Sequence, residues 1–365
     1  MNVGYKQRVK NVFNKLPDDC EAVFILNDSK LDKNFLYITG LTGSDFNYCG
    51  ILADREGKVT LFTQSLDEEL CRTKGFYTEI QVWRGPGIPK RTYEETLKKI
   101  STQYKTIGFN YDFFYYSTFK SLKKKIPKVK WIDTSKAFLE TRMIKTPNEI
   151  KRIKEACTIV SEMSFEIPSM LKEGITELEL AALIDYTMKK KGANKSAFDT
   201  IVAFGINTSQ PHYGPSNIPL QKNDVILIDF GAEVLNYKSD ITQVYFLEKP
   251  SKEQTHLYNT VYKAESLAID MIKDGVTSKE TDTEVRKYID SFSQYKDRFI
   301  HGLGHGLGLD VHDHAYPKIL KKGMVITVEP GIYLSGLYGA RLEDDVIVTE
   351  NGCELLTNTM KKPIE

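Results

Sequence analysis

The chain has 365 residues, a length that favours two domains or one large domain. It carries 50 lysine and arginine residues against 49 aspartate and glutamate residues, so its formal net charge is +1. This balance argues against proteins that bind nucleic acids or anionic membranes through an excess of positive charge. Hydrophobic residues make up 41% of the chain and charged residues 27%, which excludes a wholly disordered chain and indicates a sizeable core.

Three further features of the sequence bear on the location of the protein. No apolar run approaches the roughly 20 residues that a membrane-spanning helix needs. The N-terminal segment MNVGYKQRVKNVFNKL lacks the apolar stretch of a secretory signal. The five cysteines are scattered, odd in number and never in a CxxC spacing, which disfavours disulfides and thiolate zinc sites. We therefore expect a cytoplasmic protein that contacts neither nucleic acid nor membrane.

The first third of the chain has the pattern of alternating strands and helices. Apolar, β-branched runs bounded by turn formers predict strands over residues 21–27, 57–63 and 105–110. Residues 93–104, directly before the third run, have helical periodicity. Strands that alternate with helices predict an α/β domain.

A domain boundary is expected near residues 135–147, which gives an N-terminal domain over 1–140 and a C-terminal domain over 141–365. Pro147 suits the first turn of a helix, and Glu149 follows at a position where the helix dipole favours an acid. An amphipathic helix is therefore predicted over residues 148–171.

The second part of the chain contains a faint internal repeat. Residues 173–192 resemble residues 274–292, since each stretch has glycine, a β-branched residue and threonine ahead of a predicted helix. At nearly the same offset, the strand predicted over residues 224–231 resembles the one over 323–331. Two α/β halves can look alike by chance. However, acidic residues also match between them, which favours a true repeat.

Four carboxylates occupy matching positions in the two halves. Asp229 and Glu329 each close an apolar strand, whereas Asp240 and Glu343 each open onto another β-rich segment. An unpaired buried carboxylate costs several kcal/mol or becomes protonated, so each acid alone is more simply explained by a nearby lysine, arginine or solvent. All four together favour a pair of divalent cations with room for a bridging hydroxide. Oxygen ligands with one or two imidazoles suit manganese or cobalt.

Histidines supply the remaining polar groups of this region. A glycine-rich stretch over residues 299–316 contains four of the six histidines of the chain: His301, His305, His312 and His314. Its glycines allow close approach of the backbone, but no clear helix follows, which disfavours a dinucleotide-binding loop. A fifth histidine, His212, lies in a turn-rich SQPHYGP segment, and His256 is expected to be an ordinary surface residue of a helix.

The C-terminal two-thirds of the chain resembles the pita-bread metallopeptidases, and most closely their Xaa-Pro-cleaving branch of prolidases and aminopeptidases P. The resemblance lies in IVAFGINTSQPHYGP, DFGAEVLNYKSDIT, HGLGHGLGLDVHD, VITVEPGIY and GARLEDDVIVTENG. The segment NFLYITGLTGSD resembles the accessory domain of the family more weakly. The resemblance implies an N-terminal α/β accessory domain and a pseudo-two-fold catalytic domain. It also implies a homodimer.

The same resemblance implies two divalent metal ions per chain, with manganese or cobalt preferred and zinc as a third candidate. Asp229 would bind one ion, and Asp240 and Glu343 would bridge both. His305 and Glu329 would complete the shell of the other ion. Glu343 is in addition expected to handle the protons of the bridging water. The implied reaction is hydrolysis of the bond between an N-terminal residue and proline in small peptides.

Further residues match positions that surround the metals in the family. His212 would contact the substrate and assist proton movement, with His301 and His312 as additional active-site imidazoles. Tyr333 and Arg341 would contact the substrate and support the metal-binding carboxylates.

Two departures from the family pattern concern specificity. Gln243 stands where an arginine is common, outside the expected metal shell, and predicts only a change in packing. The loop over residues 312–323 lacks the arginine with which prolidases meet the carboxylate of a free proline, and Lys318 is the nearest basic substitute. Lysine lacks the bidentate fork of arginine, so cleavage of peptides longer than dipeptides stays open.

Two other functions are compatible with the same fold. A creatinase-like amidinohydrolase works without metals, and a non-catalytic binding module has typically lost the metal ligands. The presence of all five ligand residues in this sequence disfavours both alternatives.

Overall fold

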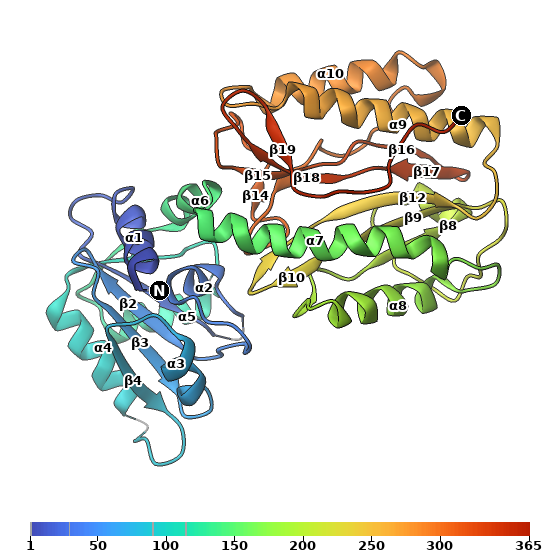
Figure 1. Cartoon of the computed structure of the whole chain (residues 1–365). Helices are drawn as coiled ribbons and strands as arrows, with labels where there is room; N and C mark the ends of the chain where they lie inside the picture. The colour runs from blue at the N-terminus through green and yellow to red at the C-terminus, as the bar shows by residue number, and fades with distance from the viewer. Residues whose placement is uncertain (1, 29, 90, 114) are drawn as a thin grey trace. The chain divides into compact units, whose positions relative to one another are not determined.

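The computed structural model describes residues 2–28, 30–89, 91–113 and 115–365 (Figure 1). The chain divides into two compact units, Met1–Arg142 and Met143–Glu365, and each is described separately. Among the described residues, no helix combines the length and the apolar composition needed to cross a membrane.

The first unit contains a mixed six-stranded sheet in the order β4-β3-β2-β1-β5-β6. Strand β1 pairs antiparallel with β2 and parallel with β5, and β3 pairs antiparallel with β2 and parallel with β4. The three strands predicted here are confirmed as β1, β3 and β5, whereas the other three did not stand out in the sequence. The strand bounds are β1 Ala22–Leu26, β2 Gly50–Asp54, β3 Val59–Gln64, β4 Glu79–Arg84, β5 Thr106–Phe109 and β6 Lys130–Asp133.

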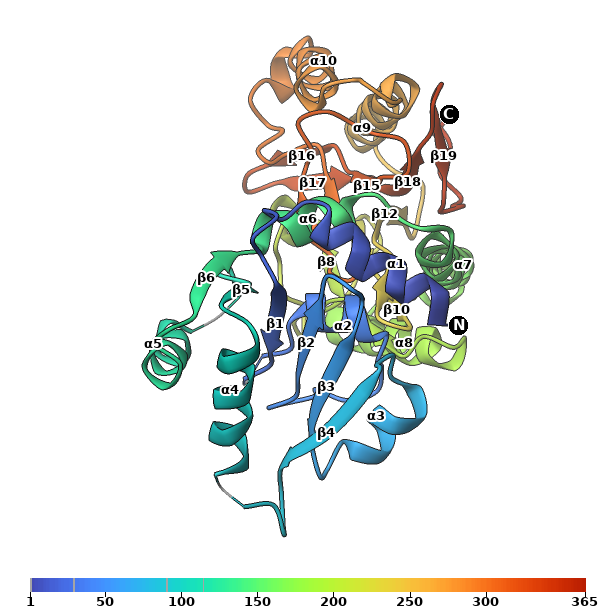
Figure 2. The same ribbon diagram turned by 90° about the vertical axis from the view of Figure 1, so that its left-hand side faces the viewer.

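Helices cover both faces of this sheet. Leu97 and Ile100 of α4 and Leu122 of α5 join the aromatic core that contains Phe24 and Phe109. Figure 2 shows α4 and α5 on one side of the strands and α3 on the other. The helix predicted over residues 93–104 is confirmed as α4. The bounds are α1 Asn2–Phe13, α2 Lys33–Thr39, α3 Glu68–Lys74, α4 Thr92–Gln103, α5 Tyr116–Lys125 and α6 Ser135–Met143.

The second unit begins with the predicted amphipathic helix, α7. Thr146 caps it, and the Glu149 side chain accepts a hydrogen bond from the Thr146 backbone, while Pro147 is its first residue. The first half of the unit contains α7 Pro147–Met170, α8 Glu177–Lys190, β7 Lys195–Ser196, β8 Ile201–Phe204, the 3₁₀ turn η1 Gly205–Ser209, β9 Val225–Phe230, β10 Ala232–Val234, β11 Tyr237–Lys238 and β12 Ile241–Phe246. Its strands form sheets ordered β12-β9-β8 and β11-β10-β7.

The second half of the unit again starts with two helices. It contains α9 Lys252–Met271, α10 Ser278–Asp290, η2 Ser293–Tyr295, β13 His305–Gly306, β14 His314–Ala315, β15 Val325–Val328, β16 Gly331–Leu334, β17 Tyr338–Arg341, β18 Asp344–Val348 and β19 Cys353–Leu355. Its strands form one sheet ordered β14-β13-β15-β18-β19 and the hairpin β16-β17. The helices α7 and α8 lie on one side of the strands, and α9 and α10 lie on the opposite side (Figure 1).

The internal repeat predicted from the sequence is confirmed in the backbone. Gly174 has φ +87° and Gly275 has φ +85°, a conformation that glycine adopts without strain. The Gly174 amide donates to the Leu220 carbonyl, and the Gly275 amide donates to the Leu320 carbonyl, both at 2.9 Å. A threonine then caps α8 and α10 in the same way, each with a glutamate three residues later.

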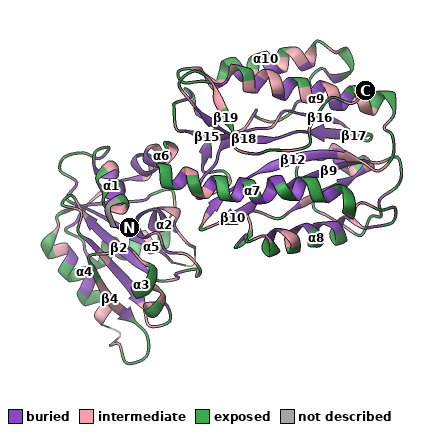
Figure 3. Cartoon of the chain, viewed as in Figure 1, coloured by how far each residue is buried: buried purple, intermediate pink, exposed green. Residues whose placement is uncertain are grey.

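Two apolar cores support the second unit, and Val225 and Val244 of the first half belong to the second of them. The first core joins α7 and α8 to β8, β9 and β12, and the second joins α9 and α10 to β15, β16 and β18. Figure 3 shows these central strands mostly buried, with the exposed residues on the outer sides of the helices. The two halves meet where the Glu343 amide donates to the Thr242 carbonyl at 3.0 Å.

Candidate active site

A cavity of about 550 Å³ lies in the second unit, where the strands of its two halves meet. All four carboxylates singled out in the sequence line it, and so do four histidines. The lining also includes an apolar wall and one arginine. The full lining is Ala197, Phe198, Ile201, Pro211, His212, Asp229, Asp240, His301, Gly302, Gly304, His305, Asp310, Val311, His312, Glu329, Arg341 and Glu343. A larger cavity of about 690 Å³ in the first unit is lined by no histidine.

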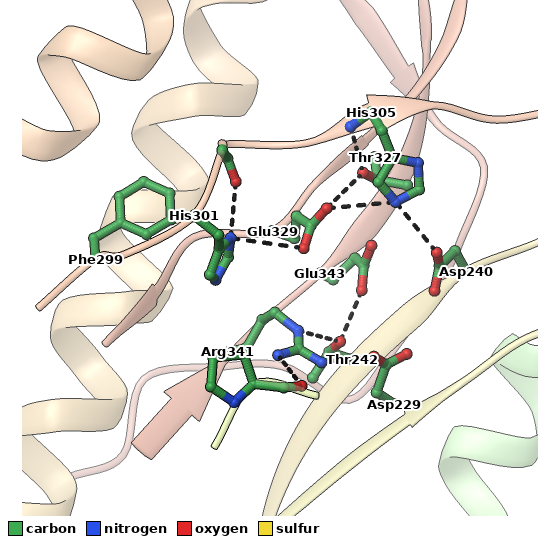
Figure 4. Close-up of polar contacts among 12 residues, drawn as sticks. Asp229, Asp240, Thr242, Phe299, His301, His305, Thr327, Glu329, Arg341 and Glu343 are labelled. Carbon is green, nitrogen blue, oxygen red and sulfur yellow. Dashed lines mark hydrogen bonds and ion pairs between the residues drawn. The ribbon is translucent and has the colours of Figure 1, made fainter. Parts of the chain in front are cut away.

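The carboxylates and His305 converge on one point of this cavity (Figure 4). His305 Nε2 lies 3.5 Å from Asp240 Oδ2 and 3.5 Å from Glu329 Oε1. One ligand atom from each of Asp240, His305 and Glu343 falls within 4.8 Å of the others. Asp229 is paired with Arg341 through Oδ2, whereas its buried Oδ1 has no hydrogen-bond partner among the described residues.

The acids of this cluster are held in a strongly unfavourable electrostatic environment. Burial, followed by the charge of Glu343, raises the pKa of Asp240 well above its ordinary value. Burial, followed by the charge of Glu329, does the same for the pKa of Glu343. Burial also raises the pKa of Asp229, although Arg341 opposes this, and it raises the pKa of Glu329 to about 7. A cation among these groups would relieve both the desolvation and the mutual repulsion.

His305 presents a neutral ring to the acids. Burial, followed by the charge of His312, lowers the pKa of His305 to about 3. Thr327 holds this region together, since its hydroxyl accepts from the His305 amide at 3.1 Å and donates to Glu329 Oε1 at 3.2 Å. A Cβ atom at Gly304 would clash with the Thr327 carbonyl, which explains the glycine before His305.

Arg341 organises the opposite side of the cavity. Its guanidinium donates to Asp229 Oδ2 at 2.6 Å, to the Thr242 hydroxyl at 2.9 Å and to the Tyr333 hydroxyl at 2.9 Å. Thr242 in turn donates to Glu343 Oε2 at 2.7 Å. Arg341 thus contacts one of the four acids directly and a second through one hydroxyl.

His301 is tied to the same network. Its Nε2 lies 2.9 Å from the Tyr333 hydroxyl, and its Nδ1 lies 2.9 Å from the Gly302 carbonyl and 4.0 Å from Glu329 Oε2. Burial, followed by the charge of Arg341, lowers the pKa of His301 to about 4. The ring is therefore neutral near pH 7. The uncharged imidazole can accept a proton from another group in the cavity, and before it does so it adds no positive charge.

His212 and His312 line the cavity from two exposed loops. The turn that carries His212 is anchored by its neighbour Tyr213, whose hydroxyl donates to Glu177 Oε2 at 2.8 Å. Glu177 is fully buried in the first turn of α8, and its other oxygen accepts from the Phe204 amide at 2.9 Å. The ring of His312 packs edge-on against His305, with ring centroids 4.2 Å apart.

Lys318, the residue expected to meet a proline carboxylate, lies elsewhere. Its side chain is exposed and does not line the cavity, and its carbonyl accepts from the Ser278 amide at the start of α10. Gln243 is buried and its amide donates to the Thr242 carbonyl at 2.8 Å, consistent with a packing role.

Three supporting residues escaped the sequence analysis. These are Glu177, Thr242 and Thr327, each of which connects two parts of the site through hydrogen bonds. Thr242 lies two residues after Asp240, and Thr327 lies two residues before Glu329. Because side chains two apart on a strand share a face, this spacing was the available signal.

Comparison with known proteins identifies the family. Residues 151–350 match the model of metallopeptidase family M24, and residues 8–144 match the creatinase/prolidase N-terminal domain. The chain belongs to metallopeptidase family M24. It is 33% identical to an Xaa-Pro dipeptidase of Pyrococcus furiosus, over 94% of this chain and 98% of that one. It is 32% identical to an uncharacterized peptidase of Bacillus subtilis, over 98% and 99% of the two chains.

Solved structures of an X-Pro aminopeptidase and a prolidase share the architecture. The X-Pro aminopeptidase of Thermotoga maritima matches with a TM-score of 0.87 and 33% identity, over 97% of each chain. The prolidase of Pyrococcus horikoshii matches with a TM-score of 0.87 and 31% identity, over 99% of this chain and 100% of that one. The pita-bread fold and the α/β N-terminal domain expected from the sequence are therefore confirmed.

The buried acids fit the divalent ions that the M24 family implies. Arg341 is the one arginine or lysine among the described residues that line the cavity, whereas five acidic residues line it, Asp310 among them. The donor set of carboxylate oxygens with one imidazole suits a hard or borderline divalent cation. The unpartnered Oδ1 of Asp229 adds a free donor atom.

The raised pKa of Glu329 predicts how stability depends on pH when the protein is stripped of metal. A carboxyl group with a raised pKa binds its proton more tightly in the folded protein than in the unfolded chain. The protonated Glu329 therefore stabilises the fold at low pH, and this contribution is lost as pH rises through about 7. The lowered pKa values of His301 and His305 act in the opposite direction, but only below about 6.5. The free energy of unfolding should therefore fall between about pH 6.5 and 8, by on the order of 1 kcal/mol from Glu329 alone.

Denaturant unfolding of chelator-treated protein at several pH values measures this slope. The Glu329→Gln variant lacks the titrating group and should show a shallower decline. An unfolding free energy that rises over this interval in the parent protein would contradict the electrostatic description of the cluster.

Proposed function

We propose that this protein hydrolyses the peptide bond between an N-terminal residue and proline with the help of two divalent metal ions. The observation that carries the proposal is the convergence of three buried carboxylates, the partly buried carboxylate of Glu329 and His305 on one cavity, with the pKa values of all four acids raised. Relatives named Xaa-Pro dipeptidase and X-Pro aminopeptidase support the choice of substrate.

The proposed ligands are those expected from the sequence. Asp229, Asp240, His305, Glu329 and Glu343 would hold the ions, with Asp240 and Glu343 shared between them. When bound, such ions supply an activated water near neutral pH and polarise the carbonyl of the scissile bond. Manganese and cobalt suit this donor set, and zinc is the next candidate.

The side chains around the ligands would bind and orient the peptide and move its protons. His212, on an exposed turn at the cavity, is proposed to donate a hydrogen bond to the substrate and to carry a proton. His301 and His312 are proposed to contact the peptide as further imidazoles. Arg341 and Tyr333 keep Asp229 and His301 in place through their hydrogen bonds.

The apolar wall of the cavity gives the substrate a place to bury its side chain and ring. Phe198, Ile201 and Val311 are among the apolar residues that line the cavity. Burial of a proline ring there would contribute roughly 25 cal/mol per Å² of apolar surface removed from water.

The same cavity predicts tolerance of longer peptides. A strict dipeptidase needs a cationic partner for the free carboxylate of proline, because an unpaired buried carboxylate is costly. Arg341 already pairs with Asp229, and no other described lining residue is a lysine or arginine. We therefore expect Ala-Pro-Ala to be hydrolysed with a kcat/KM within about tenfold of that for Ala-Pro, a difference of less than 1.4 kcal/mol.

Steady-state kinetics with Ala-Pro, Ala-Pro-Ala and the control Ala-Ala tests both the specificity for proline and the tolerance of longer peptides. Turnover of Ala-Ala at the rate of Ala-Pro would argue against proline specificity, and no turnover of Ala-Pro-Ala would restore the strict dipeptidase. Lys318→Ala belongs in the same experiment. Its position outside the cavity predicts little change, whereas a KM increase confined to Ala-Pro would support the role expected from the sequence.

A further inference from the structure

The C-terminal tail packs against Glu343 and the start of strand β18, which begins at the next residue. Residues 356–365 form no helix or strand, yet the side chain of Lys361 is only 6% exposed. Its Nζ donates to Glu265 Oε1 of α9 at 2.5 Å and pairs with Asp344 Oδ2 at 2.7 Å. It also donates to the backbone carbonyl of Glu343 at 3.3 Å. The tail therefore contacts both Glu343 and the residue that follows it.

Thr357 holds the same strand from a second point. Its hydroxyl donates to Asp344 Oδ1 at 2.6 Å and accepts from the Asp345 amide at 3.2 Å. The Leu356 amide donates to the Asp345 carbonyl at 2.8 Å. Both carboxylate oxygens of Asp344 are thus occupied by the tail, one by Lys361 and one by Thr357.

The strand held in this way also contacts the other half of the unit. Asp345 is fully buried, and its Oδ2 accepts from the Asp240 amide at 2.9 Å. A displacement of residues 343–345 would therefore move the side chain of Glu343 and disturb the backbone of Asp240. These two residues carry the carboxylates that converge with His305 in the cavity.

A buried lysine contributes little net free energy to folding. Taking its charge out of water is expensive, and a well-packed apolar residue often stabilises a protein as much or more. An apolar side chain could not donate to the Glu343 carbonyl or to Asp344. The contacts of Lys361 therefore fix the position of the backbone at Glu343, the residue whose carboxylate is proposed to bind metal.

We propose that Lys361 and Thr357 are positioning residues for the metal centre, acting through the backbone of Glu343 and Asp240. This inference rests on the proposed function in one respect: it requires that Glu343 and Asp240 bind metal. It predicts that the affinity for metal depends on the tail, although no tail residue lines the cavity.

The experiment measures binding of Mn²⁺ to purified full-length protein by the EPR signal of the free ion, with no substrate present. Lys361→Met and Thr357→Val should each lower the Mn²⁺ affinity by about 10-fold to 100-fold, the usual effect of removing a residue that supports metal ligands. Asn259→Ala is the matched control. Asn259 exchanges two hydrogen bonds of 2.9 Å with the backbone of Ile364, so this change releases the same tail without touching residues 343–345.

Activity at saturating Mn²⁺ provides a second measurement. Because the loss is one of affinity, kcat of Thr357→Val should recover as Mn²⁺ is added, whereas Asn259→Ala should need no extra metal. Should Lys361→Met fail to fold, Thr357→Val still decides the question, since it keeps the buried charges paired. An Mn²⁺ affinity of folded Thr357→Val equal to that of the parent, or an equal loss in Asn259→Ala, would overturn the proposal. Failure of the parent protein to bind Mn²⁺ would instead count against the proposed function.

Discussion

Removal of divalent metal should abolish Xaa-Pro hydrolysis by this protein, and Mn²⁺ or Co²⁺ should restore it. Asp229, Asp240 and Glu343 are buried and Glu329 is partly buried, and the pKa values of all four acids are raised, so without a counter-ion they tend to keep their protons. A divalent cation would let them ionise together beside the neutral ring of His305. Lewis-acid stabilisation is worth several kcal/mol, so its loss should reduce the rate by at least about 10³-fold. The measurement is hydrolysis of Ala-Pro before and after dialysis against chelator.

Substitution of the two carboxylates proposed to contact both ions should likewise abolish hydrolysis, without a chelator. Asp240→Ala and Glu343→Ala should be the most damaging changes, because each would remove a group proposed to contact both ions. Glu354→Ala is a suitable control, since Glu354 is an exposed acid paired with Lys154 on the surface. Full activity in a chelator-treated sample whose metal content is shown to be nil would refute the metal-dependent mechanism.

His212→Ala should lower kcat by about 10²-fold to 10⁴-fold while metal content stays at the level of the parent protein. His212 lines the cavity but does not belong to the cluster of Asp240, His305 and Glu343. Its turn should survive the change, because Tyr213 and Glu177 anchor the turn independently of the imidazole. The measurements are kcat for Ala-Pro and elemental analysis of the purified variant.

His256→Ala is the matched control for the loss of one imidazole. His256 lies exposed on α9, with its Nδ1 2.9 Å from the Tyr295 hydroxyl, and should be dispensable for turnover. If His212→Ala loses metal together with activity, His212 is a ligand and the division of roles proposed above is wrong.

Much of this architecture could be predicted because it depends on local patterns. The repeat was visible since a glycine with positive φ followed by a capping threonine leaves the same signature before α8 and before α10. Asp229 and Glu329 were conspicuous because acids are rare in strands whose remaining residues are apolar. Each of these features is encoded by a few neighbouring residues and can therefore be read from the sequence.

Other features depend on contacts between distant segments and left no local signal. The family resemblance implied that Arg341 supports the metal-binding carboxylates, but only the fold shows that its direct ion pair is with Asp229, which is distant along the chain. Lys361 lies in a segment of polar composition with no periodicity, and its burial follows only from the fold. Lys318 was considered because of its distance along the chain from His312, although it lies outside the cavity lining.

The division of the proposed metal ligands between the two halves gives the metal site a thermodynamic role beyond catalysis. Asp229 and Asp240 project from the first half, and His305, Glu329 and Glu343 project from the second. Two ions held by these five residues would cross-link the two halves, since Asp240 and Glu343, each proposed to contact both ions, come from different halves. Since a ligand bound only by the native state stabilises it by RT ln(1 + [L]/Kd), the bound ions would oppose separation of the halves by a free energy that grows with the logarithm of their affinity. Metal supply would then govern the stability of the folded chain as well as its turnover.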